Sequence, residues 1–210
     1  MKITVFGATG HVGSLFVEEA LKAGHEIVAY VRNPKKMKIQ NEKFFFVQGD
    51  LENAEKIEEA IKGADAVVSV VGPLGRQEKL IFAPAYESMI ASMKKHGVKR
   101  LIALGTPSVP DAHDRFNFIF WTLTFGVGFL IHKGYTDMKT LGQDIRESGL
   151  DWTIARVPLL TNRPKQGNVK VGYFGNGVTW FRLTRADFAD FLVKQLTDKT
   201  YIGKAPAISN

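Results

Sequence analysis

The chain has 210 residues, 45% of them hydrophobic and 23% charged, which suits one folded domain with a sizeable core. It contains no cysteine, which excludes disulfides, thiolate catalysis and cysteine-ligated metal sites. The formal net charge of +7 is scattered along the chain except for one dense run from Arg32 to Lys38, so we expect a small anionic ligand rather than nucleic acid.

Two apolar stretches bear on localisation. The apolar run at Met1–Gly7 is too short for a signal peptide, so we expect a strand there and a cytoplasmic protein. The segment Phe116–Ile131 carries no charge, but it is shorter than the roughly 20 apolar residues of a spanning helix. We expect it to line a pocket or lie buried, with shallow membrane contact or a dimer contact as alternatives and no stable membrane insertion.

Short apolar runs alternate with amphipathic segments, as in βαβ units with a parallel sheet. The predicted strands are Lys2–Phe6, Glu26–Val31, Phe44–Gln48, Ala66–Val71, Arg100–Leu104 and Trp152–Arg156. The predicted helices are His11–Ala23, Asn53–Ile61, Leu80–His96, Thr136–Ser148 and Arg185–Leu196, the last opened by Thr184 with Asp187 three residues on. We therefore predict an α/β fold with a doubly wound parallel sheet and helices on both faces.

The chain is predicted to form a single domain over residues 1–210. After Arg156, prolines and glycines break the pattern into loops and short strands. We expect residues 157–210 to contribute the substrate side of a cleft within that domain.

A glycine-rich loop, Gly7-Ala8-Thr9-Gly10-His11-Val12-Gly13, stands between the first predicted strand and helix. Glycines let the backbone turn tightly and approach a pyrophosphate, and the helix N-terminus offers N–H groups to the phosphates. The expected cofactor-binding residues here are Gly7, Thr9, Gly10, His11, Val12 and Gly13. The loop predicts a Rossmann-type nicotinamide dinucleotide site, the alternative being a plain strand-to-helix turn.

The end of the second strand indicates which dinucleotide binds. NAD sites usually place a carboxylate there, whereas this chain has Arg32, followed by Lys35 and Lys36. Arg32 can pair with a 2′-phosphate, so NADP(H) is favoured over NAD(H). The alternative is a solvated basic loop.

Two further turns are predicted to face the cofactor, because ligands of open α/β sheets bind outside the carboxyl ends of the strands. They contain Asp50 with Leu51 and Val71 with Gly72. Asp50 either accepts a hydrogen bond from the adenine or belongs to the N-cap region of the next helix.

With these motifs, the chain resembles the atypical short-chain dehydrogenase/reductases, and within them the NAD(P)H-binding, NmrA-like group that includes biliverdin reductase B and flavin reductase. The resemblance covers nearly the whole chain. The motifs that carry it are the glycine loop, Val31–Pro34, Gln48–Leu51, Ser148–Arg156 and Thr184–Asp190. It implies the fold and cofactor class, but the group contains reductases, epimerases or dehydratases, and sensors without turnover.

In short-chain dehydrogenases, a Tyr four residues before a Lys donates the proton, and this chain has Tyr135 and Lys139 at that spacing. The pair is about one residue out of the family's register, so the alternative is a packed Tyr with Lys139 in solvent. The family's companion hydroxyl matches Thr106, with Ser108 in reserve, unless both only satisfy loop backbone groups. No metal site is expected, because the five histidines show no ligand spacing.

These observations predict an NAD(P)H-dependent oxidoreductase, a monomer or homodimer, that transfers a hydride to a small apolar carbonyl, quinone or flavin. A non-catalytic NADP(H)-binding redox sensor is the rival. An NAD-dependent epimerase or dehydratase is a third possibility.

Overall fold

The computed structural model describes residues 1–72, 80–116, 132–177 and 181–210. The segment Phe116–Ile131, apart from Phe116 itself, lies outside the described residues, and so do the side chains of His132, Lys133 and Tyr135. The expected role of that segment therefore stays a prediction.

One sheet runs through the molecule, with the strand order β3-β2-β1-β4-β5-β6-β10-β8. Every neighbouring pair is parallel except β8 and β10, which are antiparallel. The strands are β1 Lys2–Phe6, β2 Glu26–Val31, β3 Phe44–Gln48, β4 Ala66–Ser69, β5 Arg100–Gly105, β6 Asp151–Arg156, β8 Lys170–Gly172 and β10 Ala207–Ser209. A separate two-stranded sheet pairs β7 Leu160–Thr161 with β9 Leu183–Thr184.

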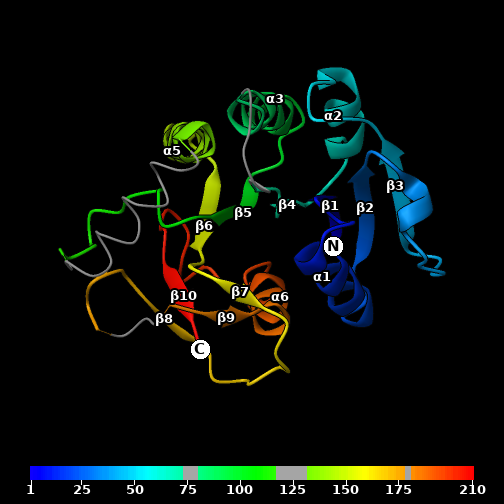
Figure 1. Cartoon of the computed structure of the whole chain (residues 1–210). Coiled ribbons are helices and arrows are strands. Elements are labelled where there is room, and N and C mark those ends of the chain that lie inside the picture. Colours follow the sequence, from blue (N-terminus) through cyan, green and yellow to red (C-terminus); the bar gives the residue numbers. More distant parts are fainter. Residues whose placement is uncertain (73–79, 117–131, 178–180) are drawn as a thin grey trace.

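Helices cover both faces of the sheet, with α1 and α6 on one side and α2, α3 and α5 on the other (Figure 1). Their bounds are α1 His11–Lys22, α2 Ala54–Ile61, α3 Phe82–Lys95, α5 His132–Glu147 and α6 Arg185–Lys194, with a short 3-10 turn η1 Pro34–Lys36. The central strands are apolar on both faces, and Ile3, Val67 and Ile102 are fully buried. The predicted doubly wound α/β fold is confirmed.

Element ends differ from the sequence-based prediction by a few residues. Strand β4 ends at Ser69 rather than Val71, because the chain leaves the sheet after Val70 donates one hydrogen bond, 3.0 Å long, to the Phe6 carbonyl. Helix α5 begins at His132, not Thr136, and Gly134 inside it is buried, where its lack of a side chain suits close packing. The short strands β7, β8, β9 and β10 were not predicted individually, because strands of two or three residues give no periodic signal.

The order of the strands fixes where a ligand binds. After β1 the chain builds β2 and β3 on one side, and then β4, β5 and β6 on the other. Strand β1 is therefore flanked by β2 and β4, and the connections leave it in opposite directions. In open α/β sheets, the crevice outside the carboxyl ends of strands at such a reversal is the usual ligand site.

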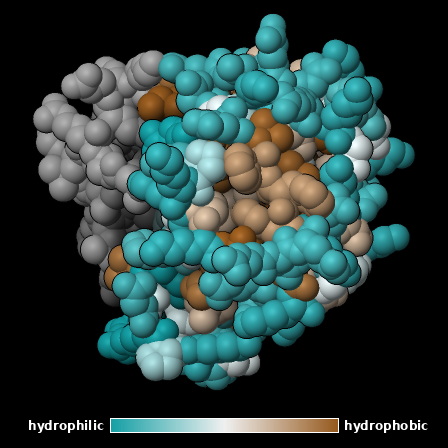
Figure 2. All heavy atoms as spheres, turned by 90° about the vertical axis from the view of Figure 1, so that its right-hand side faces the viewer, coloured by the Kyte–Doolittle hydropathy of each residue, from teal (hydrophilic) through white to brown (hydrophobic). Residues whose placement is uncertain are grey.

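The outer edge of the sheet carries an apolar patch. Figure 2 looks onto the β3 side of the molecule, where apolar side chains are surrounded by hydrophilic ones. Phe45 and Phe46 of β3 are 50% and 53% exposed. The patch belongs to the edge strand, whereas the residues considered below gather at the carboxyl ends of the strands.

Within the parts of the chain that the structure describes, no helix is both long and apolar enough to cross a lipid bilayer.

Candidate functional site

The glycine loop connects β1 directly to α1. Gly7 has a φ of +86°, a backbone conformation that residues with a Cβ rarely adopt. Its carbonyl accepts a hydrogen bond of 3.0 Å from the Gly10 N–H. A Cβ on Gly13 would overlap the Gly7 carbonyl oxygen and lie 2.8 Å from the Ala8 Cα. The loop therefore folds back on the first turn of α1 in a way that only glycine allows at these two positions.

The N-terminus of α1 is open to an anion. Its N-cap residue is Gly10, which has no side chain to cap the helix, and the first turn contains no acidic residue. The first intrahelical bond runs from the Ser14 N–H to the Gly10 carbonyl over 2.9 Å, which leaves the amides of the preceding turn to other partners. Thr9, Gly10 and His11 are exposed, while Val12 and Gly13 are buried under the loop. Exposed amides at the positive end of a helix dipole suit a phosphate.

The turn after β4 lies against this loop. A Cβ on Gly7 would come within 3.1 Å of the Val70 carbonyl carbon and 3.2 Å of the Val71 nitrogen. A Cβ on Gly72 would meet the Leu104 side chain at 3.3 Å, so the chain also stays close to the end of β5. The structure thus brings Val71 beside the glycine loop and Gly72 beside the end of β5, and that both face a cofactor stays a prediction.

The end of β2 is basic and solvent-facing. Arg32 is exposed, and so are Lys35 and Lys36 in η1. The Asn33 side chain accepts a hydrogen bond of 3.1 Å from the Lys35 N–H and so caps η1. The loop therefore has a defined backbone, with its cations free to meet a ligand from solvent.

Tyr30 fixes the turn that follows β3. Its hydroxyl donates a hydrogen bond of 2.6 Å to the Asp50 carbonyl, and burial, with smaller contributions from Asp50 and Glu59, raises the pKa of Tyr30 to about 12. A Cβ on Gly49 would overlap the Tyr30 hydroxyl. The Asp50 carboxylate accepts the Glu52 N–H at 3.0 Å, whereas Asn53 is the N-cap of α2. Asp50 thus orders the turn before α2 without being its N-cap, and Leu51 beside it is partly buried.

The two candidate hydroxyls after β5 bind each other. Thr106 Oγ1 and Ser108 Oγ are 2.6 Å apart, with Ser108 buried and Thr106 partly exposed. A turn, closed by the Val109 N–H donating to the Thr106 carbonyl over 3.1 Å, holds them together. Because only one proton lies between the two oxygens, the other hydroxyl hydrogen can be donated outward. If Ser108 donates, Thr106 keeps its proton for a ligand.

The Tyr–Lys pair is only partly described. Tyr135 and Lys139 both lie in α5, but the Tyr135 side chain is outside the described residues, and Lys139 is exposed. Between them, Asp137 is fully buried and caps α3: its carboxylate accepts N–H groups from Ile81 at 2.7 Å and Phe82 at 2.9 Å. A third bond, from the Ala83 N–H, is 2.7 Å long. No pattern in the sequence indicates this role, because the capping carboxylate comes from a distant helix.

An ion pair at the end of β6, between the buried Arg156 and the partly exposed Asp114, was not singled out from the sequence. The Arg156 side chain is 0% exposed, and its Nη1 and Nη2 atoms lie 2.5 Å and 2.7 Å from the two oxygens of Asp114. Arg156 also donates to the carbonyls of Ala205, at 2.6 Å, and Val109, at 3.0 Å. Its position in the motif Ser148–Arg156 is a sequence signal, but nothing in the sequence marked Asp114 as the partner.

Asp187 ties the loop after β7 to α6. Thr184 caps α6, as predicted, by accepting the Asp187 N–H at 3.1 Å. In place of a reciprocal bond to the Thr184 backbone, the Asp187 carboxylate accepts the N–H groups of Gln166 and Gly167, each at 2.8 Å. These bonds and the Thr184 hydroxyl outweigh burial and lower the pKa of Asp187. The C-terminal loops are therefore ordered by a side chain that the capping motif points to.

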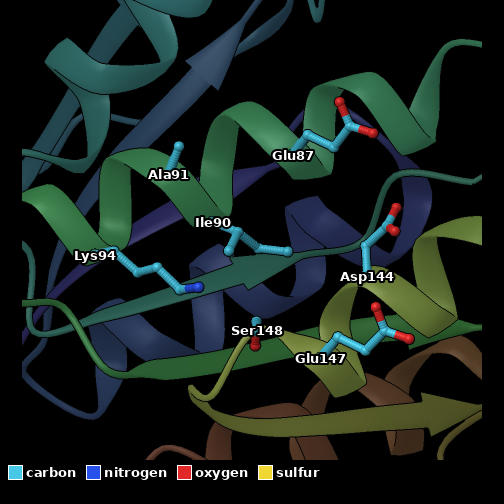
Figure 3. A pocket seen from close by; sticks show the side chains of 7 residues that line it. All are labelled: Glu87, Ile90, Ala91, Lys94, Asp144, Glu147 and Ser148. Carbon is cyan, nitrogen blue, oxygen red and sulfur yellow. The ribbon is translucent and has the colours of Figure 1, made fainter.

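A hollow between α3 and α5 is lined by three carboxyl groups and one cation, Lys94, so it carries a net negative charge (Figure 3). Glu87, Asp144 and Glu147 line it, and burial, followed by the charges of Glu87 and Glu147, raises the pKa of Asp144. It lies along the later turns of both helices, which run back toward the amino ends of the strands. Its negative charge and its position make it unsuited to a phosphorylated ligand, in contrast to the glycine loop.

No group of three metal-binding side chains occurs within the described ranges. His113 instead bonds its neighbour, with Nδ1 2.8 Å from Asp111 Oδ1, and its ring stacks on Tyr173. The described part of the site therefore consists of backbone amides, cations and hydroxyls.

A family model described as NAD(P)H-binding matches residues 7–199 of this chain. The match begins at the first glycine of the loop and ends beyond α6, so it includes the glycine loop, the turns after β2, β3, β4 and β5, and both α5 and α6.

Two relatives illustrate the sequence similarity. The chain is 36% identical over 105 residues to the uncharacterized protein YwnB of Bacillus subtilis, a stretch that covers 50% of this chain and 47% of YwnB. It is 44% identical over 93 residues to an isoflavone reductase homolog of Solanum tuberosum, covering 39% of this chain and 30% of that protein. The matched stretches thus span from under a third to about half of these relatives' lengths.

Solved structures share the fold over the full chain. A short-chain dehydrogenase/reductase from Veillonella parvula in complex with NADP has a TM-score of 0.82 at 19% identity, covering 100% of this chain and 94% of that one. ChuY, an anaerobilin reductase from Escherichia coli O157:H7, has a TM-score of 0.77 at 19% identity, covering 100% and 97%. These structures show that the chain shares the fold of short-chain dehydrogenase/reductases, as the resemblance implies.

Proposed function

Since the chain belongs to the NAD(P)H-binding family, we propose that it is an NADPH-dependent reductase acting on a small, largely apolar carbonyl, quinone or flavin. The observation that carries the proposal is the open N-terminus of α1 behind a loop in which Gly7 and Gly13 admit no side chain. Both features favour a diphosphate held by backbone amides.

The residues present fit a dinucleotide along the carboxyl edge of the sheet. Thr9, Gly10 and His11 would meet the diphosphate, and Asp50 and Leu51 would border the adenine. Val71 and Gly72, packed against Gly7 and Leu104, would border the middle of the cofactor. When bound, the reduced nicotinamide supplies the hydride, and the chain's own groups bind and orient the two partners.

The preference for NADP(H) rests on the basic end of β2. Arg32, Lys35 and Lys36 are exposed there, and the sequence Val31-Arg32-Asn33 offers no carboxylate to a ribose hydroxyl. A guanidinium binds a phosphate through paired charge-assisted hydrogen bonds. Binding of NADP to the similar Veillonella protein agrees with this assignment.

On the acceptor side, Thr106 is the proposed hydrogen-bond donor to the acceptor oxygen, oriented by Ser108. Tyr135 and Lys139 are proposed as the proton-donating pair. On α5, Gly142 packs on Val109, and Arg146 Nη2 donates to the Pro110 carbonyl, so one side of the helix faces the loop that carries Thr106. Helical periodicity puts positions 135 and 139 on that side. A quinone or flavin acceptor would need no protein acid, and Tyr135 would then be dispensable.

A non-catalytic redox sensor is the second candidate. The register of Tyr135 and Lys139, about one residue from that of the family, favours it, because a shifted pair would not present its proton donor to an acceptor. Two solved structures, named as a putative epimerase/dehydratase and a putative epimerase, share only the fold with this chain, at 24% and 23% identity. An epimerase or dehydratase is therefore a weaker proposal. The reductase proposal includes two further expectations. Residues 157–210 contribute to the acceptor side, and the protein is cytoplasmic.

Titration of the protein with NADPH and NADH tests the cofactor assignment. We expect tighter binding of NADPH, and about tenfold weaker NADPH binding for Arg32→Ala with NADH affinity unchanged. Lys62→Ala removes one exposed charge at the end of α2 and should leave both affinities unchanged. Tighter binding of NADH, or equal losses from both variants, would contradict the role of Arg32.

NADPH oxidation in the presence of menadione, flavin mononucleotide and an aromatic aldehyde tests the reaction. Turnover with at least one of them supports the reductase. Micromolar NADPH binding without turnover of any acceptor favours the sensor.

A further inference from the structure

The Arg156–Asp114 ion pair joins three segments that are far apart in the sequence. Arg156 ends β6, where it is paired in register with Gly105, the last residue of β5. A Cβ on Gly105 would lie 3.0 Å from the Arg156 Cγ, so the stem of the arginine crosses directly over this glycine. The guanidinium then bonds Val109, one residue after Ser108, and Ala205, just before β10.

Asp114 completes the junction. Besides Arg156, its Oδ2 accepts the Asp111 N–H at 2.9 Å, and its Oδ1 accepts the Phe174 N–H at 3.0 Å. The Phe174 ring lies against the guanidinium, with its centroid 4.7 Å from the Arg156 Cζ. The Arg115 N–H donates to the Phe174 carbonyl over 2.9 Å. One ion pair therefore holds both the loop after β5 and the turn after β8.

The burial of Arg156 defines how it can act. Its side chain is 0% exposed and makes four hydrogen bonds, so it cannot touch an acceptor itself. Removing the Asp114 charge would leave the buried guanidinium without its counter-charge, so the arrangement resists change. Asp114 is anchored on each oxygen by a backbone N–H as well as by the guanidinium. The pair is thus a rigid support for the residues above it.

We propose that the Arg156–Asp114 pair is the positioning element of the acceptor site. It fixes the loop from Thr106 to Asp114, and with it the Thr106–Ser108 hydroxyl pair that would orient an acceptor. The glycine loop and the basic end of β2 lie on other strands and do not depend on it. The inference rests on the reductase function proposed above and adds that acceptor recognition is set by an ion pair whose arginine is buried beneath the loop.

The variants Arg156→Lys and Asp114→Asn test this role. Lysine keeps the positive charge but cannot span both Asp114 oxygens and two carbonyls, and asparagine keeps the shape of Asp114 without its charge. We expect the KM for menadione to rise about tenfold in each, with the Kd for NADPH within twofold of wild type. Amide hydrogen exchange of residues 106–114 should accelerate in the protein without ligand.

Arg100→Lys is the matched control. Arg100 is a second buried arginine, 9% exposed, that donates to the Gln195 carbonyl at 2.7 Å and the Asp151 carbonyl at 2.9 Å. It begins β5, at the opposite edge of the sheet from Thr106. We expect a comparable loss of Tm in Arg100→Lys, with the menadione KM and the exchange of residues 106–114 unchanged.

Two results would overturn the positioning role. In the first, amide hydrogen exchange of residues 106–114 is no faster in Arg156→Lys and Asp114→Asn than in Arg100→Lys. In the second, both variants weaken NADPH binding as much as they raise the menadione KM. If Arg156→Lys fails to fold, Asp114→Asn carries the comparison. If the wild-type protein reduces no acceptor, the proposed reductase function is wrong. The hydrogen-exchange data then still decide whether the ion pair fixes this loop.

Discussion

The two halves of the proposed cleft are built in different ways. On the dinucleotide side, between β1 and α1, position is set by the backbone: Gly7 turns where other residues cannot, and Gly13 leaves room for the loop to close. On the acceptor side, beyond β5, position is set by side chains, chiefly Arg156 with Asp114 and Asp187 with residues 166 and 167. A backbone site suits a ligand common to many proteins, whereas a side-chain framework can change with the acceptor.

Gly13→Ala should have the largest effect, because the added methyl overlaps the Gly7 carbonyl and forces the loop away from α1. We expect NADPH affinity to fall at least about 100-fold, through the loss of several amide contacts to phosphate. Isothermal titration gives the Kd. In the control Gly10→Ala, the Cβ would meet the Gly7 oxygen at 3.2 Å, so the loss should be clearly smaller. Equal affinities for wild type and Gly13→Ala would mean that the dinucleotide binds elsewhere.

Thr106→Val tests the acceptor side. Valine keeps the shape of threonine without the hydroxyl, so kcat/KM for menadione should fall about 100-fold, the lower end of the range for loss of one donor to a developing oxyanion. The Kd for NADPH should not change. Ser108→Ala should lose less, because Ser108 acts by orienting Thr106. A larger loss in Ser108→Ala would exchange the roles of the two hydroxyls.

Tyr30→Phe probes the adenine end of the dinucleotide side. It removes the 2.6 Å hydrogen bond to the Asp50 carbonyl, so the turn at Gly49–Asp50 loses one anchor. One hydrogen bond is worth about 1 kcal/mol, so we expect NADPH affinity to fall about three- to fivefold. Fluorescence titration measures this loss. An unchanged Kd would separate Asp50 from the cofactor site.

Asp144→Asn should have the smallest effect and should leave the cleft unchanged. A carboxyl whose pKa is raised on folding, here mainly by burial, destabilises the protein above its ordinary pKa, and this effect fades as pH falls. The variant should therefore raise Tm at pH 7, by up to about 3 °C, and by less at pH 4. Thermal unfolding at both pH values measures the difference. Glu147→Gln, at a more exposed site, should change Tm less.

The sequence predicts the dinucleotide side, which the backbone sets, better than the acceptor side, which side chains set. Local patterns predict the glycine loop and the strands β1 to β6. The structure has each of them within a few residues of the predicted bounds. The contacts of Asp114, Asp137 and Asp187 join residues 20 to 60 positions apart. No spacing rule marks such contacts in a single sequence. Tyr135 and Lys139 fit a spacing rule, yet that rule alone does not say whether their side chains meet a ligand.

The most direct test of the account is to follow the backbone amides by nuclear magnetic resonance while NADPH is added. The account predicts that the largest shifts fall on Gly7–Gly13 and on Arg32, with smaller ones at Val71 and Gly72. If those amides stay unmoved at saturating NADPH, or if the largest shifts fall on the acidic hollow between α3 and α5, the proposed site is wrong.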